Sequence, residues 1–155
     1  MSVYFFDSSA IVKRYIRNEK GFAYIEDITN PKNRNLIFAA RISQVEVVAA
    51  LARRQKSGRL IRSDFDDALR AFQQDLSNHY FVVEITKDIL DIAMDYALRH
   101  GLRGYDAVQL AACIETNNER VLRGLPPLTL VSADLELNAA ANGEGLPVND
   151  PNKFP

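Results

Sequence analysis

The chain lacks what several large protein classes require. Its 155 residues include one cysteine, two histidines and no tryptophan. The lone Cys113 excludes a disulfide framework and suits a reducing cytoplasm. The longest apolar runs fall far short of the roughly 20 residues that span a bilayer, and no basic-then-apolar signal sequence opens the chain. We therefore expect a cytoplasmic protein without membrane-spanning segments.

Charge of one sign is not in excess either. Lys and Arg number 19 and Asp and Glu number 20, for a formal net charge of −1. This balance gives no case for a broad basic surface of the kind that attracts nucleic acids, but it leaves room for local patches. The densest basic run contains Arg53, Arg54, Lys56, Arg59 and Arg62. Any polyanionic ligand must therefore be held by a local cluster of cations.

Several motifs for phosphate and acyl chemistry are missing. No glycine-rich turn ends in Gly-Lys-Ser or Gly-Lys-Thr, so there is no P-loop. No nucleophile elbow accompanies the two histidines, which argues against a serine hydrolase. A phosphatase of the haloacid dehalogenase type needs a second Asp two residues after the first, but that position is Ser9. A phospho-acceptor receiver domain needs adjacent acids, whereas Ser8 follows Asp7.

What the sequence does contain is an alternation of strand and helix patterns. Residues 3–6 form an apolar run typical of a strand buried on both faces. Further strands are expected at 36–39, 80–83 and 128–131, with a weak edge strand at 146–148. Helical apolar spacing lies between them, which predicts parallel strands joined by crossovers in a helix-rich, layered α/β domain. We assign residues 1–149 to one domain and 150–155 to a C-terminal tail of loop composition, and we expect a polar loop at 117–127.

Four acids occupy equivalent places in this pattern. Asp7 and Asp134 follow predicted strands, Glu46 lies one turn into the helix after the second strand, and Asp106 opens a later helix. Ligands of open α/β sheets bind outside the carboxyl ends of the strands, so these side chains should converge there. Ser8 or Ser9, and Ser132, could bond a carboxylate or a phosphate, although turn and cap bonding explains each of them equally well.

Each acid also has a simpler explanation when it is considered alone. Asp7, Asp106 and Asp134 are good helix N-caps, and Ser43 to Glu46 has the pattern of a capping box. Three or four converging carboxylates, however, would repel one another, and a divalent cation would remove that penalty. Oxygen ligands without His or Cys suit Mg²⁺ or Mn²⁺. We expect Ser8 and Ser9 to cap the first helix while Asp7 faces the ion.

These residues resemble the motifs of PIN-domain ribonucleases, in particular the VapC-type toxins of toxin–antitoxin pairs. Residues 4–13, 43–47, 104–111 and 130–134 are similar, in that order, to four motifs of the family. The resemblance implies a three-layer α/β/α sandwich around a mainly parallel sheet of four or five strands. It also implies Mg²⁺- or Mn²⁺-dependent cleavage of RNA, a homodimer, and inhibition by a VapB-type antitoxin.

The resemblance also implies roles for individual residues. Asp7, Glu46 and Asp106 match the catalytic, metal-binding acids, Asp134 matches a fourth and more variable acid, and Ser8 and Ser132 match positions that are usually Ser or Thr. The implied reaction is in-line attack by water, which leaves a 5′-phosphate and a 3′-hydroxyl. Two other functions stay open. One is a structure-specific DNA nuclease, although a helical arch has no room here, and the other is a catalytically silent RNA- or protein-binding module.

Overall fold

A parallel sheet of five strands forms the centre of the molecule. The fold is taken from a computed structural model, in which residues 1–154 are described. The strands are β1 (Val3–Phe6), β2 (Leu36–Ala40), β3 (Tyr80–Val83), β4 (Thr129–Val131) and β5 (Val148–Asn149). They lie in the order β3-β2-β1-β4-β5, and every pair is parallel. The predicted layered α/β class, with a sheet of up to five strands, is confirmed.

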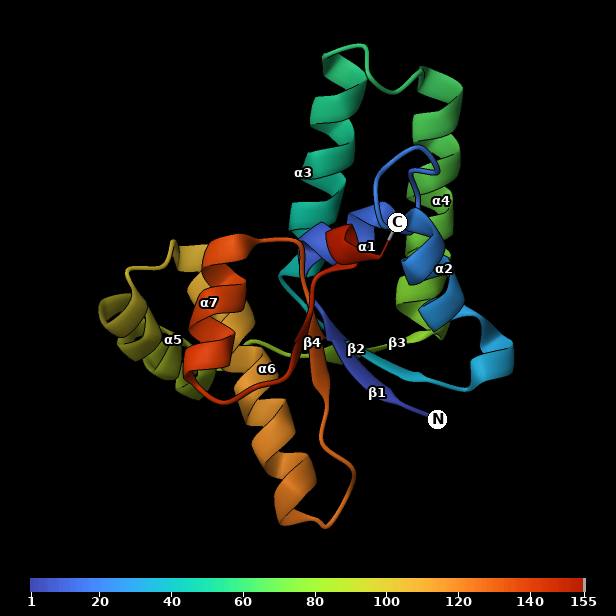
Figure 1. Cartoon of the computed structure of the whole chain (residues 1–155). Coiled ribbons are helices and arrows are strands. Elements are labelled where there is room, and N and C mark those ends of the chain that lie inside the picture. Colours follow the sequence, from blue (N-terminus) through green and yellow to red (C-terminus); the bar gives the residue numbers. More distant parts are fainter. Residues whose placement is uncertain (155) are drawn as a thin grey trace.

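Helices cover both faces of this sheet (Figure 1). The α-helices in the described chain are α1 (Ser8–Lys13), α2 (Phe22–Thr29), α3 (Ser43–Lys56), α4 (Arg62–Asn78), α5 (Lys87–His100), α6 (Gly104–Leu122) and α7 (Leu135–Gly143). Short 3₁₀ helices occupy Pro31–Asn33 and Pro151–Lys153. One face of the sheet packs on α5, α6 and α7, and the other on α1 to α4. None of these helices combines the length and the apolar character that crossing a bilayer requires.

The strands alternate between the two cores because successive side chains of a strand point to opposite faces. Phe5 and Leu130 belong to the core under α5, α6 and α7, whereas Phe6 and Val131 belong to the core under α1 to α4. These four side chains are fully buried. The uninterrupted apolar run of β1 is therefore the consequence of a strand that is covered on both sides.

The sheet order explains why distant segments meet at one edge. β1 is central and pairs with β2 on one side and β4 on the other. The backbone amide of Asp7 continues the pairing by donating to the carbonyl of Val131 at 3.2 Å. The chain leaves β1, β2 and β4 at the same edge and enters α1, α3 and α7 there. The side chains at these three strand-to-helix junctions are consequently neighbours.

The prediction of a polar loop at 117–127 is wrong for the first half of that range, because α6 continues to Leu122. The polar residues there complete the helix and the short turn after it. Asn117 accepts a hydrogen bond from the amide of Leu128 at 3.0 Å, and buried Arg120 donates to the carbonyl of Pro126 at 2.9 Å. The guanidinium of Arg120 also lies 5.5 Å from the ring centre of Phe38. The polarity reflects these contacts and exposed helix surface rather than irregular backbone.

Residues 150–154 pack against α2. Asp150 caps the 3₁₀ helix by accepting from the amide of Asn152 at 2.9 Å, and the ring of Phe154 stacks on Tyr24 with centres 4.1 Å apart. Gly21, at the start of α2, has φ +85°, and a Cβ atom there would lie 2.6 Å from the carbonyl oxygen of Pro151. Only glycine combines this left-handed backbone with so close an approach. A segment with the composition of a loop is thus closely packed.

Candidate active site

A cavity of about 590 Å³ opens at the carboxyl edge of the sheet, among the first turns of α1, α3, α6 and α7. All four acids singled out in the sequence line it, together with Ser8. These acids are Asp7, Glu46, Asp106 and Asp134. The structure therefore brings together carboxylates that lie up to 127 positions apart in the chain, and Ser132 lies directly behind one of them.

Asp7 is the most deeply buried of these acids, with 2% of its surface exposed. Its Oδ1 accepts from the amide of Ala10 at 2.9 Å and from Ser9 Oγ at 2.7 Å, and its Oδ2 accepts from Ser132 Oγ at 2.9 Å. Burial raises the pKa of Asp7 to about 7, and the nearby charge of Asp134 adds to the rise, although the three hydrogen bonds oppose it. Asp7 is thus a rigidly held carboxyl group for which ionisation is costly.

The expected division of roles between Asp7 and its serines is wrong. Asp7 itself is the N-cap of α1, because its Oδ1 accepts the amide of Ala10. Ser9 instead donates to Asp7 and accepts from the amide of Ala133 at 2.9 Å, so it ties α1 to the segment after β4. The short side chain of Asp7 reaches the free amide of Ala10 from the end of β1, and Ser9 donates to the same carboxylate oxygen.

Glu46 faces the cavity rather than the start of its own helix. Its Oε2 accepts from Ser8 Oγ at 3.0 Å, and its Oε1 accepts from Gln109 Nε2 at 2.8 Å. The N-cap of α3 is Ile42, which precedes the expected cap Ser43. The capping-box explanation is therefore wrong, because both oxygens of Glu46 are bonded to side chains of α1 and α6.

Asp106 and Asp134 differ in how far the capping explanation applies. Asp134 caps α7 by accepting from the amide of Leu137 at 2.9 Å. Asp106 is the third residue of α6, whose N-cap is Arg103, so Asp106 is not a cap. Partial burial and the charges of Asp134 and Glu46 raise the pKa of Asp106 to about 6, while Arg103 lowers it. Mutual repulsion among the acids is therefore part of the electrostatics of this cavity.

Ser132 connects two of the acids from beneath the cavity. Its side chain is fully buried, and its Oγ donates to Asp7 Oδ2 while accepting from the amide of Asp134 at 3.0 Å. A hydroxyl suits this position because one atom both donates and accepts. The Ser that follows β4 thus fixes the carboxyl group that follows β1.

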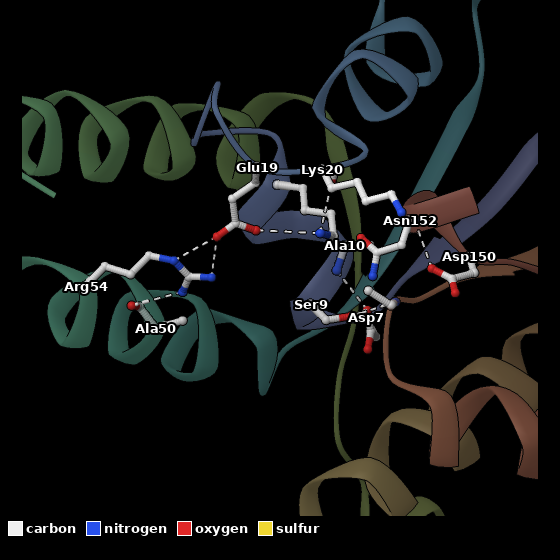
Figure 2. Close-up of polar contacts among 11 residues, drawn as sticks. Asp7, Ser9, Ala10, Glu19, Lys20, Ala50, Arg54, Asp150 and Asn152 are labelled. Carbon is white, nitrogen blue, oxygen red and sulfur yellow. Dashed lines mark hydrogen bonds and ion pairs between the residues drawn. The ribbon is translucent and has the colours of Figure 1, made fainter. Parts of the chain in front are cut away.

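The sequence reasoning missed a fifth acid at the rim. Glu19 lies in the loop between α1 and α2 and is paired with two cations (Figure 2). Arg54 Nε donates to Glu19 Oε1 at 2.9 Å, and buried Lys13 places Nζ 3.6 Å from Glu19 Oε2. Lys13 also donates to the carbonyl of Lys20 at 2.8 Å. Because Glu19 is neutralised in this way, it differs from the four acids inside, and no local pattern marks it in the sequence.

Gln109 is the other missed residue, and it touches Glu46. It sits in the second turn of α6 with 1% of its surface exposed, and Nε2 donates to Ser43 Oγ at 2.9 Å as well as to Glu46. Within the described chain, no three His, Cys, Asp or Glu side chains are close enough together to hold a metal ion as they stand. The cavity lining includes oxygen donors but neither His nor Cys.

Comparisons with known proteins show the family to which the chain belongs. The profile of the PIN domain family matches residues 4–142. The chain is 30% identical over 145 residues to ribonuclease VapC45 of Mycobacterium tuberculosis, which covers 94% of this chain and 93% of that protein. The chain belongs to the PIN domain family. Its resemblance to the VapC proteins, inferred above from four short motifs, is thereby confirmed.

Solved structures share the fold. Mycobacterium tuberculosis VapC20, described as a toxin that cleaves the sarcin–ricin loop, superposes with a TM-score of 0.60 at 17% identity, over 88% of this chain and 94% of that one. A VapBC-1 chain from nontypeable Haemophilus influenzae superposes with a TM-score of 0.60 at 13% identity, over 96% of this chain and 98% of that one. The PIN-like fold expected from the sequence is confirmed.

Proposed function

We propose that this chain is a divalent-metal-dependent endoribonuclease and the toxin of a VapBC-type toxin–antitoxin pair. The observation that carries the proposal is the convergence of Asp7, Glu46, Asp106 and Asp134 on one cavity at the carboxyl edge of the sheet. The membership in the PIN family and the similarity to proteins named as VapC ribonucleases support it. The substrate is RNA, and the products carry a 5′-phosphate and a 3′-hydroxyl.

The donor set in the cavity fits Mg²⁺ or Mn²⁺. Its oxygen donors without His or Cys suit these ions rather than zinc. Burial, with a smaller contribution from repulsion between the acids, raises the pKa of Asp7 to about 7 and that of Asp106 to about 6, and a bound cation would oppose both effects. The four acids, which line the cavity together, would hold the ion. When bound, the ion supplies Lewis-acid activation of water and neutralises charge on the phosphate.

The protein's own residues divide the remaining work. Asp7 is the fixed reference point, because three hydrogen bonds hold its carboxyl group and its strand is covered on both faces. Glu46 and Asp106 face it from helices that belong to opposite layers of the sandwich. Ser9 and Ser132 fix Asp7 and tie it to the segment that carries Asp134. The ligands are thereby oriented before substrate arrives.

Arg103 and Arg53 are the side chains suited to hold the RNA backbone. Both line the acid cavity, and both are exposed. Neither forms an ion pair within the described chain, in contrast to Arg54, which is bound to Glu19. Tyr105, with 60% of its surface exposed, lies beside them and presents an aromatic face to an unpaired base. Phosphate contacts from two local cations compensate for a net charge near zero.

We expect Arg103→Gln to weaken RNA binding uniformly across sequences. Loss of one phosphate contact should lower the slope of log affinity against log salt by about 1. The measurement is a salt titration with labelled RNA in Ca²⁺ or EDTA, under conditions without cleavage. The control is Arg70→Gln, which removes an exposed arginine paired with Asp67 on α4, outside the cavity. An unchanged salt slope for Arg103→Gln would remove this residue from the RNA-binding surface.

The proposed activity is tested by metal removal. The purified chain is incubated with end-labelled RNA, or with DNA of the same sequence, in Mg²⁺, Mn²⁺ or EDTA. We expect cleavage of RNA with either ion, none in EDTA, recovery when Mg²⁺ is added back, and a 5′-phosphate on the products by mass spectrometry. Cleavage in EDTA, or products with a 2′,3′-cyclic phosphate, would refute the metal-dependent mechanism. Preferential cleavage of DNA would instead favour a DNA nuclease.

Two assembly partners belong to the same proposal. One is a VapB-type antitoxin, as the similarity in fold to chains of toxin–antitoxin complexes suggests. The other is a second copy of this chain, for which the exposed apolar stripe of Leu90, Met94 and Leu98 along α5 offers a contact surface. We place both assemblies in the cytoplasm. Size-exclusion chromatography with light scattering, with and without a candidate antitoxin, measures them.

A further inference from the structure

Gln109 is an unusual residue for its surroundings. Residues 107–114 of α6 are all buried, and Gln109 is the single amide among them. Its Nε2 group contacts two residues in the first turn of α3. It donates to Ser43 Oγ at 2.9 Å and to Glu46 Oε1 at 2.8 Å. The long polar side chain thus crosses from the helix layer that contains α6 to the layer that contains α3.

The other end of the same amide carries a cost. Gln109 Oε1 is buried and has no hydrogen-bond partner within the described structure. Buried polar atoms without partners are uncommon in folded proteins, and each one calls for a reason. Simple stabilisation of the helix interface is a poor reason, because an apolar side chain of the same length would avoid the unsatisfied oxygen.

The orientation of the amide points to Glu46 as the reason. An ionised carboxylate only accepts hydrogen bonds, so Nε2 rather than Oε1 must face it. The hydroxyl of Ser43 can turn to donate or accept, and it imposes no such choice. Glu46 has three rotatable side-chain bonds and is partly exposed, so without a fixed partner its carboxylate would sample many positions. Ser8 provides one donor to Glu46, and Gln109 provides the second from the rigid core.

We propose that Gln109 is a positioning residue, which fixes the carboxylate of Glu46 toward the acid cavity and so sets the affinity of the site for its divalent cation. The inference rests on the proposed function, because it assumes that Glu46 is a ligand. Gln109 itself touches neither substrate nor cation. Partners of this kind typically change metal affinity by 10- to 100-fold when they are replaced.

The test is a calorimetric titration of Mn²⁺ into the full-length protein, with thermal melting of each variant in EDTA. Gln109→Met keeps the length of the side chain, removes both donors and also removes the unpartnered oxygen. We expect its Mn²⁺ affinity to fall by about tenfold, with little change in the melting temperature of the metal-free protein. The matched control is Thr116→Val, which removes a buried hydroxyl two turns along the same helix, bonded at 2.7 Å to the carbonyl of Ala112. Its Mn²⁺ affinity should be that of the wild type.

A double-variant comparison separates positioning of Glu46 from a general effect on packing. In a Glu46→Gln background, Gln109→Met should cause no further loss of Mn²⁺ affinity, because the carboxylate that Gln109 positions is already absent. Equal additional losses in both backgrounds would overturn the inference, as would wild-type affinity in Gln109→Met. If Gln109→Met fails to fold, Gln109→Glu takes its place, since it keeps the shape and replaces the donor by an acceptor.

The outcomes distinguish this inference from the function on which it rests. If the wild-type protein binds Mn²⁺ and cleaves RNA while Gln109→Met does the same with equal affinity, the positioning role alone is refuted. If the wild-type protein binds no Mn²⁺, the metal site and the positioning role fail together.

Discussion

The variant Asp7→Asn is expected to lose at least about a hundredfold in RNA cleavage while it keeps its fold. Asn retains an oxygen that can accept from the amide of Ala10, so the cap of α1 survives. It lacks the negative charge that would hold the cation, and metal ions contribute several kcal/mol of transition-state stabilisation. Each ~1.4 kcal/mol corresponds to a tenfold change in rate. The measurement is the single-turnover cleavage rate of labelled RNA in saturating Mg²⁺, with circular dichroism as the test of folding.

The chain offers a matched control for this variant in Asp150→Asn. Asp150 is also a buried Asp that caps a helical turn, with its side chain accepting from the amide of Asn152 (Figure 2). It does not line the acid cavity. Its replacement should leave the cleavage rate unchanged. Wild-type cleavage by Asp7→Asn would mean that Asp7 is a cap and no more.

The second large effect is on stability as a function of pH in the absence of metal. In EDTA, the wild-type protein should become less stable as pH rises from about 4 to about 7. The pKa of Asp7 is raised from 3.8 to about 7 in the folded protein, so between these values the folded state binds the proton and the unfolded state has lost it. The free energy of unfolding then decreases with rising pH. One pKa unit corresponds to about 1.4 kcal/mol, so the upper limit of the decrease from Asp7 is about 4 kcal/mol.

Asp7→Asn removes this contribution, so it should be more stable than the wild type at pH 7.5 in EDTA and closer to it at pH 4. Urea denaturation at the two pH values measures both differences. Adding Mn²⁺ at pH 7.5 should stabilise the wild type, because the ion binds only the folded protein. Asp7→Asn should be nearly unaffected, because it lacks the carboxylate that would hold the ion. The same pH dependence in the two proteins would show that burial of Asp7 carries no electrostatic cost.

Much of the fold and of the site follows from local sequence patterns. The apolar run from Val3 to Phe6 predicts a strand covered on both faces. Acids that follow parallel strands are expected to lie close together, because the carboxyl ends of these strands share one edge of the sheet. A strand that is not buried on both faces, or an acid deep within a helix, would have given a weaker pattern. Asp7, Glu46 and Asp134 line one cavity for this reason, and Asp106 reaches the same cavity from the first turn of α6.

What the sequence could not supply depends on contacts between distant segments. Ser9 holds the backbone of Ala133, and Gln109 holds Glu46, across 124 and 63 positions respectively. Neither residue type is informative by itself, since serine after a strand suggests a cap and glutamine in a helix suggests a solvated face. The extension of α6 to Leu122 was missed for a related reason. Its polar residues are bonded to the turn that follows, and that turn is defined only in the folded chain.

The position of β4 has a consequence for the chain while it is being made. β1 is synthesised first, yet its neighbour on one side is β4, which is separated from it by more than 120 residues. Until that strand leaves the ribosome, Asp7 lacks the hydroxyl of Ser132 behind it, and the cavity lacks the wall that carries Asp134. Nascent chains and fragments that end before this point therefore contain three of the four acids but no completed site. The acid cavity is therefore complete only near the end of translation, when β4 and the segment that carries Asp134 have been made.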